Sequence, residues 1–85
     1  MPYSIEVTRT AEKQLKKLSR NDQRRVIEAV VALANDPYPN GVRKLTGYND
    51  VFRIRVGRFR VIYSVSRKKL VVIILKVGHR KDVYR

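Results

Sequence analysis

The sequence predicts an α+β fold: an N-terminal strand, an antiparallel helical hairpin and a three-stranded antiparallel meander, in the order β-α-α-β-β-β. Two segments in the first half carry apolar residues at helical spacing. Three runs rich in β-branched residues fill most of the second half. Two amphipathic helices and a sheet form two layers when their apolar faces pack together. Since 85 residues are too few for two cores, residues 1–85 are expected to form a single domain.

The first elements are a short strand and a short helix. Residues 3–7 (YSIEV) alternate apolar and polar side chains, as a half-buried strand does. Thr8 or Thr10 then offers a hydroxyl group that can cap the start of a helix. In that helix, apolar residues recur at i, i+4 and i+7: Ala11, Leu15 and Leu18.

A second helix follows at once. Ser19 with Asp22 resembles an N-terminal capping arrangement, and the Asn-Asp-Pro sequence of residues 35–37 ends the helix. Its apolar residues form a broad stripe: Val26, Ile27, Val30, Val31, Leu33 and Ala34. Two amphipathic helices joined this tightly predict an antiparallel hairpin.

Residues 36–50 read as a long connecting loop, because they contain two prolines and two glycines. Leu45 is its expected anchor to the core. Strands are then expected over residues 51–56, 59–65 and 70–77, with turns at 57–58 and 66–69. The last strand lacks polar alternation, so we expect it to be central and covered on both faces. The N-terminal strand is expected beside that strand or at an edge of the sheet.

The positive charge is concentrated in the second half of the chain. Residues 1–41 hold seven Lys/Arg and five Asp/Glu, a net charge of +2, whereas residues 42–85 hold thirteen and two, a net charge of +11. Like charges that repel one another destabilise a compact state, so solubility alone does not explain this segregation. A solvated basic face is the simpler reading. A polyanionic partner, either nucleic acid or an acidic protein, explains the segregation better.

Several classes of protein are disfavoured by composition. The chain has no Cys, hence no disulfide framework and no thiolate metal site, and its single His lacks an H-x-x-x-H partner. It has no G-x-x-x-x-G-K-[ST] loop and no Ser/His/Asp grouping. No signal peptide and no membrane span are recognisable, since the longest apolar run covers only residues 70–75. We therefore expect a cytoplasmic protein without cofactor, metal or membrane partner.

The hairpin VFRIRV-GR-FRVIYSV has an unusual predicted register. With a two-residue turn, one face carries apolar pairs, and on the other face Arg55 lies opposite Arg60 while Arg53 lies opposite Ile62. Like charges directly opposite each other are destabilising by a few tenths to about 1 kcal/mol. Either these side chains simply extend into water, or the face binds phosphate, for which the planar guanidinium is well suited.

The C-terminal sequence GHRKDVYR adds groups able to move protons. Gly78 is expected to allow a sharp turn, which would present His79, Arg80 and Tyr84 near the arginine face. Each residue alone is more often a surface or packing residue, but together they suggest a site for metal-free phosphoryl transfer. RNA suits this chemistry because its 2′-OH can attack the adjacent phosphate.

The whole chain resembles the RelE toxins of bacterial toxin–antitoxin systems, within the RelE/ParE superfamily. The resemblance rests on the order and spacing of the N-terminal strand, the helical hairpin and four motifs: KLTG, VFRIRV, GRFRVIYSV and VGHRKDVYR. It implies a ribosome-dependent endoribonuclease that cuts mRNA in the ribosomal A site and is neutralised by a tightly bound antitoxin.

The resemblance also implies roles for individual residues. Two basic positions of the family fall on Arg53 and Arg55, its transition-state arginine on Arg60, its later arginine on Arg80 and its C-terminal tyrosine on Tyr84. Further contacts to RNA or the ribosome are expected from Lys44, Arg58, Lys81 and Arg85.

One departure from the family concerns the general base. Some members have Lys, a candidate base, where this chain has Arg53 and Arg55, and arginine stays protonated in proteins. Tyr84 and His79 are therefore the alternative proton-transfer groups. His79 is a candidate to protonate the leaving 5′-oxygen.

The implied partners are an acidic, partly disordered antitoxin and a ribosome carrying mRNA, with operon DNA contacted only through the antitoxin complex. Two other functions remain open on the same fold. One is a ParE-like toxin that binds a topoisomerase and cleaves nothing. The other is a catalytically inactive member retained for antitoxin binding or autoregulation.

Overall fold

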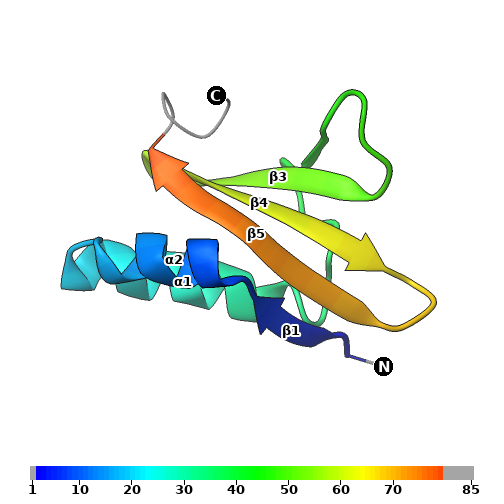
Figure 1. Ribbon diagram of the computed structural model, residues 1–85, viewed down its shortest axis with the longest axis horizontal. Coiled ribbons are helices and arrows are strands. Elements are labelled where there is room, and N and C mark those ends of the chain that lie inside the picture. The colour runs from blue at the N-terminus through cyan, green and yellow to red at the C-terminus, as the bar shows by residue number, and fades with distance from the viewer. Residues whose placement is uncertain (1, 80–85) are drawn as a thin grey trace.

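The computed structural model describes residues 2–79 and confirms the predicted α+β fold. Figure 1 shows both helices lying against one side of a single sheet. Within the described residues, no helix is both long enough and apolar enough to cross a bilayer. In chain order the elements are β1 (Ser4–Val7), α1 (Arg9–Lys16), α2 (Arg20–Ala32), β2 (Arg43–Lys44), β3 (Val51–Val56), β4 (Phe59–Ser66) and β5 (Val71–His79).

The sheet has five strands in the order β1-β5-β4-β3-β2. The N-terminal strand β1 lies beside β5 and also at the edge, so both expected placements hold. It runs parallel to β5, which makes the sheet mixed, whereas the three strands of the meander pair in antiparallel fashion. The chain between β1 and β5 contains the helical hairpin and strands β2 to β4, and it provides the long crossover that a parallel pair requires.

Both helices begin at the hydroxyl caps that the sequence offers. The Thr8 hydroxyl accepts from the Ala11 N–H at 3.1 Å, and the Ser19 hydroxyl accepts from the Asp22 N–H at 3.2 Å. Each bond satisfies one of the N–H groups that a helix start leaves without a partner.

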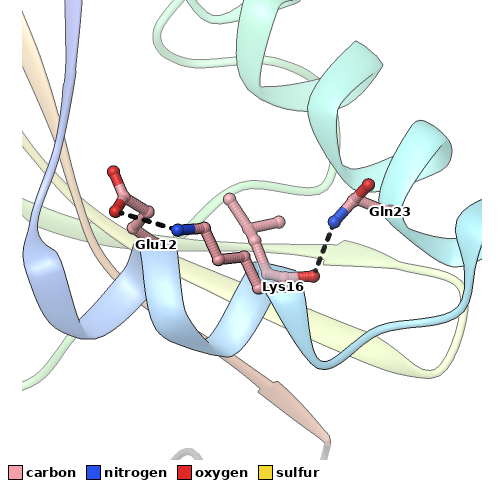
Figure 2. Close-up of polar contacts among 4 residues, drawn as sticks. Glu12, Lys16 and Gln23 are labelled. Carbon is pink, nitrogen blue, oxygen red and sulfur yellow. Dashed lines mark hydrogen bonds and ion pairs between the residues drawn. The ribbon is translucent and has the colours of Figure 1, made fainter.

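A side chain of α2 ties the two helices together. The Gln23 side-chain amide donates to the Leu15 carbonyl, near the end of α1, at 3.0 Å. Figure 2 draws this hydrogen bond as a dashed line from Gln23. The Glu12–Lys16 pair in the same view is 3.6 Å long, and both side chains are more than half exposed, so it contributes little stability. The hydrogen bond from Gln23 therefore contributes more to the stability of the helical hairpin than the ion pair does.

The apolar stripe of α2 is broader than the sheet can cover. Val26, Val30 and Leu33 are buried in the core, whereas Ile27 and Val31 are 45% and 59% exposed. The helix also ends earlier than expected, at Ala32. A sheet on one side of a helix covers only part of its circumference, so the outer part of the stripe stays in contact with water.

The expectation that the last strand is covered on both faces is wrong. Val72, Ile74 and Val77 of β5 are buried on the helix side, while Ile73 and Leu75 are only partly buried. The reason is that both helices pack on the same face. The strand also begins one residue later than expected, because Leu70 lies in the preceding turn with a φ of 55°.

Side chains of the N-terminal cap and α1 complete the edge of β5 beyond the end of β1. The Thr8 hydroxyl donates to the Leu75 carbonyl at 3.0 Å, and the Val77 N–H donates to the Gln14 side-chain oxygen at 2.7 Å. This is also where β5 has an irregular register with β4, between Ile62 and Tyr63. The two bonds therefore hold the part of β5 that leads to Gly78 and His79.

The segment 36–50 is not only a loop, since it contains the edge strand β2 paired with β3. Two residues cannot show a periodic pattern, so this strand was missed. The segment is fixed to the core by Tyr63, whose buried hydroxyl donates to the Pro37 carbonyl at 2.7 Å. Burial is the main reason that the pKa of Tyr63 is raised. Leu45, the expected anchor, is partly buried, and its N–H donates to the Val51 carbonyl at 2.9 Å.

Tyr63→Phe is expected to lower the free energy of unfolding by about 1–2 kcal/mol, because the Pro37 carbonyl loses its buried donor. For a domain of this size the melting temperature should fall by roughly 5–15 °C. Thermal melts followed by circular dichroism measure this. Tyr48→Phe is the matched control, since Tyr48 is 63% exposed. Equal melting temperatures for the two variants would contradict the assignment.

Candidate phosphate-binding face

The face of the sheet that points away from the helices, called the outer face here, collects positive charge. Among the paired strand residues that the structure describes, the register places one acid on this face, Glu6 of edge strand β1, opposite Ile73. The cations that the register places there are Arg43, Arg53, Arg55, Arg60 and Lys76. A sheet face with this balance attracts anions.

The centre of the outer face is a pair of arginines. Arg55 of β3 and Arg60 of β4 are Cα partners, and Val56 pairs with Phe59 around the Gly57-Arg58 turn. The register predicted for this hairpin is therefore confirmed. The φ of 61° at Gly57 supports the tight turn, because glycine adopts this conformation without strain.

Arg60 is the most enclosed cation of the described residues, with 6% of its surface exposed. On its other side its Cα partner is Gly78 of β5, which has no side chain to compete for space above the sheet. The prediction that Gly78 forms a sharp turn is wrong, because β5 continues through it to His79. A charge taken this far out of water interacts strongly with an anion brought beside it.

His79 lies at the end of β5 but on the other side of the sheet. It is the Cα partner of Phe59, one position along from the pair Gly78–Arg60. Neighbouring residues of a strand point to opposite faces, so the His79 side chain leaves the sheet on the helix side. Its ring packs against Phe59, with centroids 5.8 Å apart and planes at 77°. The expected turn at Gly78 is thus absent, and His79 leaves the sheet on the side opposite to that of the arginine pair.

His79 nevertheless lies close to the arginine pair at the end of the sheet. A hollow of about 270 Å³ there is lined by Arg55, Gly57, Arg58, Phe59, Arg60 and His79. Arg58, expected to bind RNA or the ribosome, is thus an exposed turn residue beside the same hollow.

Arg53 lies two residues from Arg55 on the same strand and is half-buried. It is opposite Ile62 on one side and Arg43 on the other. Arg43, Arg53 and Arg55 line a hollow of about 210 Å³ together with Gly41. Sequence reasoning missed Arg43, because its position depends on the two-residue strand β2, and it also missed Lys76, which is opposite Ile62.

The other residues expected to bind RNA or to act in catalysis either lie on the helix side of the sheet or fall outside the described residues. Lys44 is the Cα partner of Phe52, whose ring packs toward the core, so it is on the face opposite Arg43. The expected site residues beyond residue 79 lie outside the described residues: Arg80, Lys81, Tyr84 and Arg85.

This arrangement is suited to holding a phosphate diester and stabilising charge that develops on it. Arg53, Arg55 and Arg60 present three permanently charged groups on one face, with Arg60 enclosed. Within residues 2–79, no three His, Cys, Asp or Glu side chains gather where they could hold a metal ion.

Comparison with known proteins shows similarity over nearly the whole chain. The family model described as the ParE toxin of the type II toxin–antitoxin system parDE matches residues 5–84. Toxin RelG of Mycobacterium tuberculosis is 36% identical, over 100% of this chain and 99% of RelG. A RelE-type toxin of Methanocaldococcus jannaschii is 30% identical, over 100% of this chain and 98% of that protein.

Solved structures show the same fold. In the archaeal RelE–RelB complex from Pyrococcus horikoshii, one chain superposes with a TM-score of 0.85 at 35% identity, covering 98% of this chain and 100% of that one.

Proposed function

Since this chain belongs to the RelE toxins of type II toxin–antitoxin systems, within the RelE/ParE superfamily, we propose that it is a ribosome-dependent endoribonuclease of the cytoplasm. It cuts mRNA in the ribosomal A site and so stops translation. The observation that carries this proposal is the direct pairing of Arg55 with the enclosed Arg60, beside Arg53, on one face of the sheet.

The proposed reaction uses the RNA's own nucleophile. The 2′-OH loses its proton and its oxygen attacks the adjacent phosphorus, while the bond from phosphorus to the 5′-oxygen breaks and that oxygen takes up a proton. The products are a 2′,3′-cyclic phosphate and a 5′-OH. Negative charge accumulates on the phosphate oxygens in the transition state, and Arg60 and its neighbours stabilise it without a metal ion.

Proton transfer is assigned to groups other than the arginines of β3, because arginine does not deprotonate in proteins. We assign Tyr84 as the group that accepts the proton from the 2′-OH or orients it, since the C-terminal tyrosine of the RelE family falls on this position. His79 is the candidate general acid that would protonate the leaving 5′-oxygen. Because the register directs its side chain to the helix side of the sheet, we assign it a smaller part in the reaction than Tyr84. Arg80 is then available to stabilise the charge on the leaving oxygen.

Free RNA is expected to be cut poorly, with stimulation by ribosomes on the order of 10³-fold or more. Among residues 2–79 the one exposed Phe or Tyr side chain is Tyr48, so this part of the chain offers little Phe or Tyr surface for stacking bases. The ribosome must therefore position the message. Primer extension on ribosome-bound mRNA, compared with the same RNA in solution, measures the ratio. Efficient cleavage of a free oligonucleotide would contradict the proposal.

A toxin that binds a topoisomerase is the second candidate, because the matching family model carries the ParE description. The two functions differ in what brief induction produces. An endoribonuclease leaves new mRNA 5′ ends in ribosomal A sites within minutes. Growth arrest with intact mRNA and altered DNA supercoiling would favour the topoisomerase target, and an inactive member would produce neither effect.

The cognate antitoxin is expected to be acidic and partly disordered, folding as it wraps this protein. The net charge of +11 in residues 42–85 and the exposed Ile27 and Val31 of α2 support this expectation. Co-purification should give a stable complex. Raising the salt concentration should lower the association rate constant by a larger factor than it changes the dissociation rate constant. Stopped-flow binding at several ionic strengths measures both rates, and a basic partner would contradict the expectation.

A further inference from the structure

A row of side chains crosses the outer face at right angles to the strands. The Cα partners from β2 to β5 are Arg43, Arg53, Ile62 and Lys76 in turn. Partners across a sheet point to the same face. We call these four residues the transverse row. Its two ends, Arg43 and Lys76, have no role in the cleavage mechanism above.

The transverse row lies beside the arginine pair. Arg55 is two residues after Arg53 on β3, and Arg60 is two residues before Ile62 on the antiparallel β4, so the pair is about 6.6 Å away from the row along the strands. The row itself spans three strand spacings, about 14 Å between the backbones of β2 and β5. Arg43 is therefore to one side of the arginine pair and Lys76 is to the other.

The register places like charges together twice on this face. Arg43 is directly opposite Arg53, just as Arg55 is directly opposite Arg60. Such pairs destabilise a sheet, so stability alone does not favour them. The hollow that Arg43, Arg53 and Arg55 line shows that their surfaces converge on one space. An anion held in that space is attracted by all three side chains and offsets their mutual repulsion.

We propose that Arg43 and Lys76 bind the sugar–phosphate backbone of a single RNA strand that runs across the sheet from β2 to β5. Each holds a phosphate to one side of the phosphate that the arginine pair binds. The identity of the bound strand as substrate rests on the proposed function. Lys76 and Arg43 are both exposed, so their charged groups reach a ligand without rearrangement of the core.

The test is binding of a 2′-O-methyl oligoribonucleotide, which presents RNA phosphates but has no 2′-OH to attack. Fluorescence anisotropy gives Kd over a series of salt concentrations without ribosomes. Arg43→Gln and Lys76→Gln should each reduce the slope of log Kd against log salt by about 0.7, the value for one lost phosphate contact on a single strand. At low salt each variant should bind several-fold more weakly.

Arg24→Gln and Lys13→Gln are the matched controls, because they remove the same charge from exposed positions on the helices. Slopes for Arg43→Gln and Lys76→Gln that equal those of these controls would overturn the proposal. Arg43→Gln should melt at or above the parent temperature, since Arg53 then has no like charge opposite it. Arg43→Lys keeps the charge and should keep the slope. A slope lost in that variant too would show a structural effect and would also overturn the proposal.

The outcome separates this proposal from the proposed function. Reduced slopes in a protein that never cleaves ribosome-bound mRNA would support the transverse row and overturn the endoribonuclease. Cleavage of ribosome-bound mRNA by the parent protein, with unchanged slopes in the Arg43→Gln and Lys76→Gln variants, would support the endoribonuclease and overturn the transverse row.

Discussion

Arg60→Ala is expected to reduce single-turnover cleavage of ribosome-bound mRNA by about 10²–10³-fold. Arg60 is 6% exposed and lies directly opposite Arg55, so its guanidinium is a fixed, partly desolvated charge at the centre of the outer face. Such a donor needs little reorganisation when charge develops on the phosphate. Growth after induction should recover in parallel with the loss of cleavage.

The control for Arg60→Ala must separate catalysis from binding and from folding. Arg24→Ala removes the same side chain from an exposed position of α2 and should leave cleavage unchanged. The cleavage rate must be measured at saturating protein, because loss of a charge on this face also weakens affinity for the ribosome. Arg60→Lys keeps the charge without the planar fork and should retain part of the activity. Wild-type cleavage by a folded Arg60→Ala protein would refute the assignment.

Tyr84→Phe is expected to reduce cleavage by about 10²–10⁴-fold, the range for loss of a general acid–base group. The substitution removes only a hydroxyl, so a loss of this size reports proton transfer or orientation of the 2′-OH and not packing. The measurement is again single-turnover cleavage on programmed ribosomes, together with its pH dependence. Tyr48→Phe makes the same chemical change at an exposed position and should leave the rate unchanged.

Two companion variants divide the roles at the end of the chain. Arg80→Ala should reduce cleavage, since Arg80 is assigned to charge on the phosphate or the leaving oxygen. His79→Ala should have a mild effect, because the register turns His79 toward Phe59 and the helix side. A large loss of cleavage in His79→Ala would instead identify His79 as the general acid that protonates the leaving 5′-oxygen. Wild-type rates in both Tyr84→Phe and Arg80→Ala would refute the catalytic assignment at this end of the chain.

The sequence alone determined the parts of the structure that depend on neighbours along the chain. The cap at Ser19, and the cap at Thr8 as one of the two candidates Thr8 and Thr10, use bonds to backbone three residues ahead, so local geometry suffices to propose them. The β3–β4 register follows from a two-residue turn, which fixes every later pair. The opposition of Arg55 and Arg60, and with it the centre of the candidate site, was therefore readable from the sequence.

The tertiary structure alone decided the features that depend on which surfaces meet. Strand β2 exists only because β3 is beside it, and that pairing places Arg43, not Lys44, next to Arg53. Gly78 stays in β5 opposite Arg60, instead of turning the chain, so His79 leaves the sheet on the helix side. Both helices pack on one face, and this leaves Ile73 and Leu75 of β5 only partly buried. It also leaves three cations of the outer face exposed: Arg43, Arg55 and Lys76. No local pattern contains this information, because the partners of each residue come from distant parts of the chain and the packing of the whole sheet selects them.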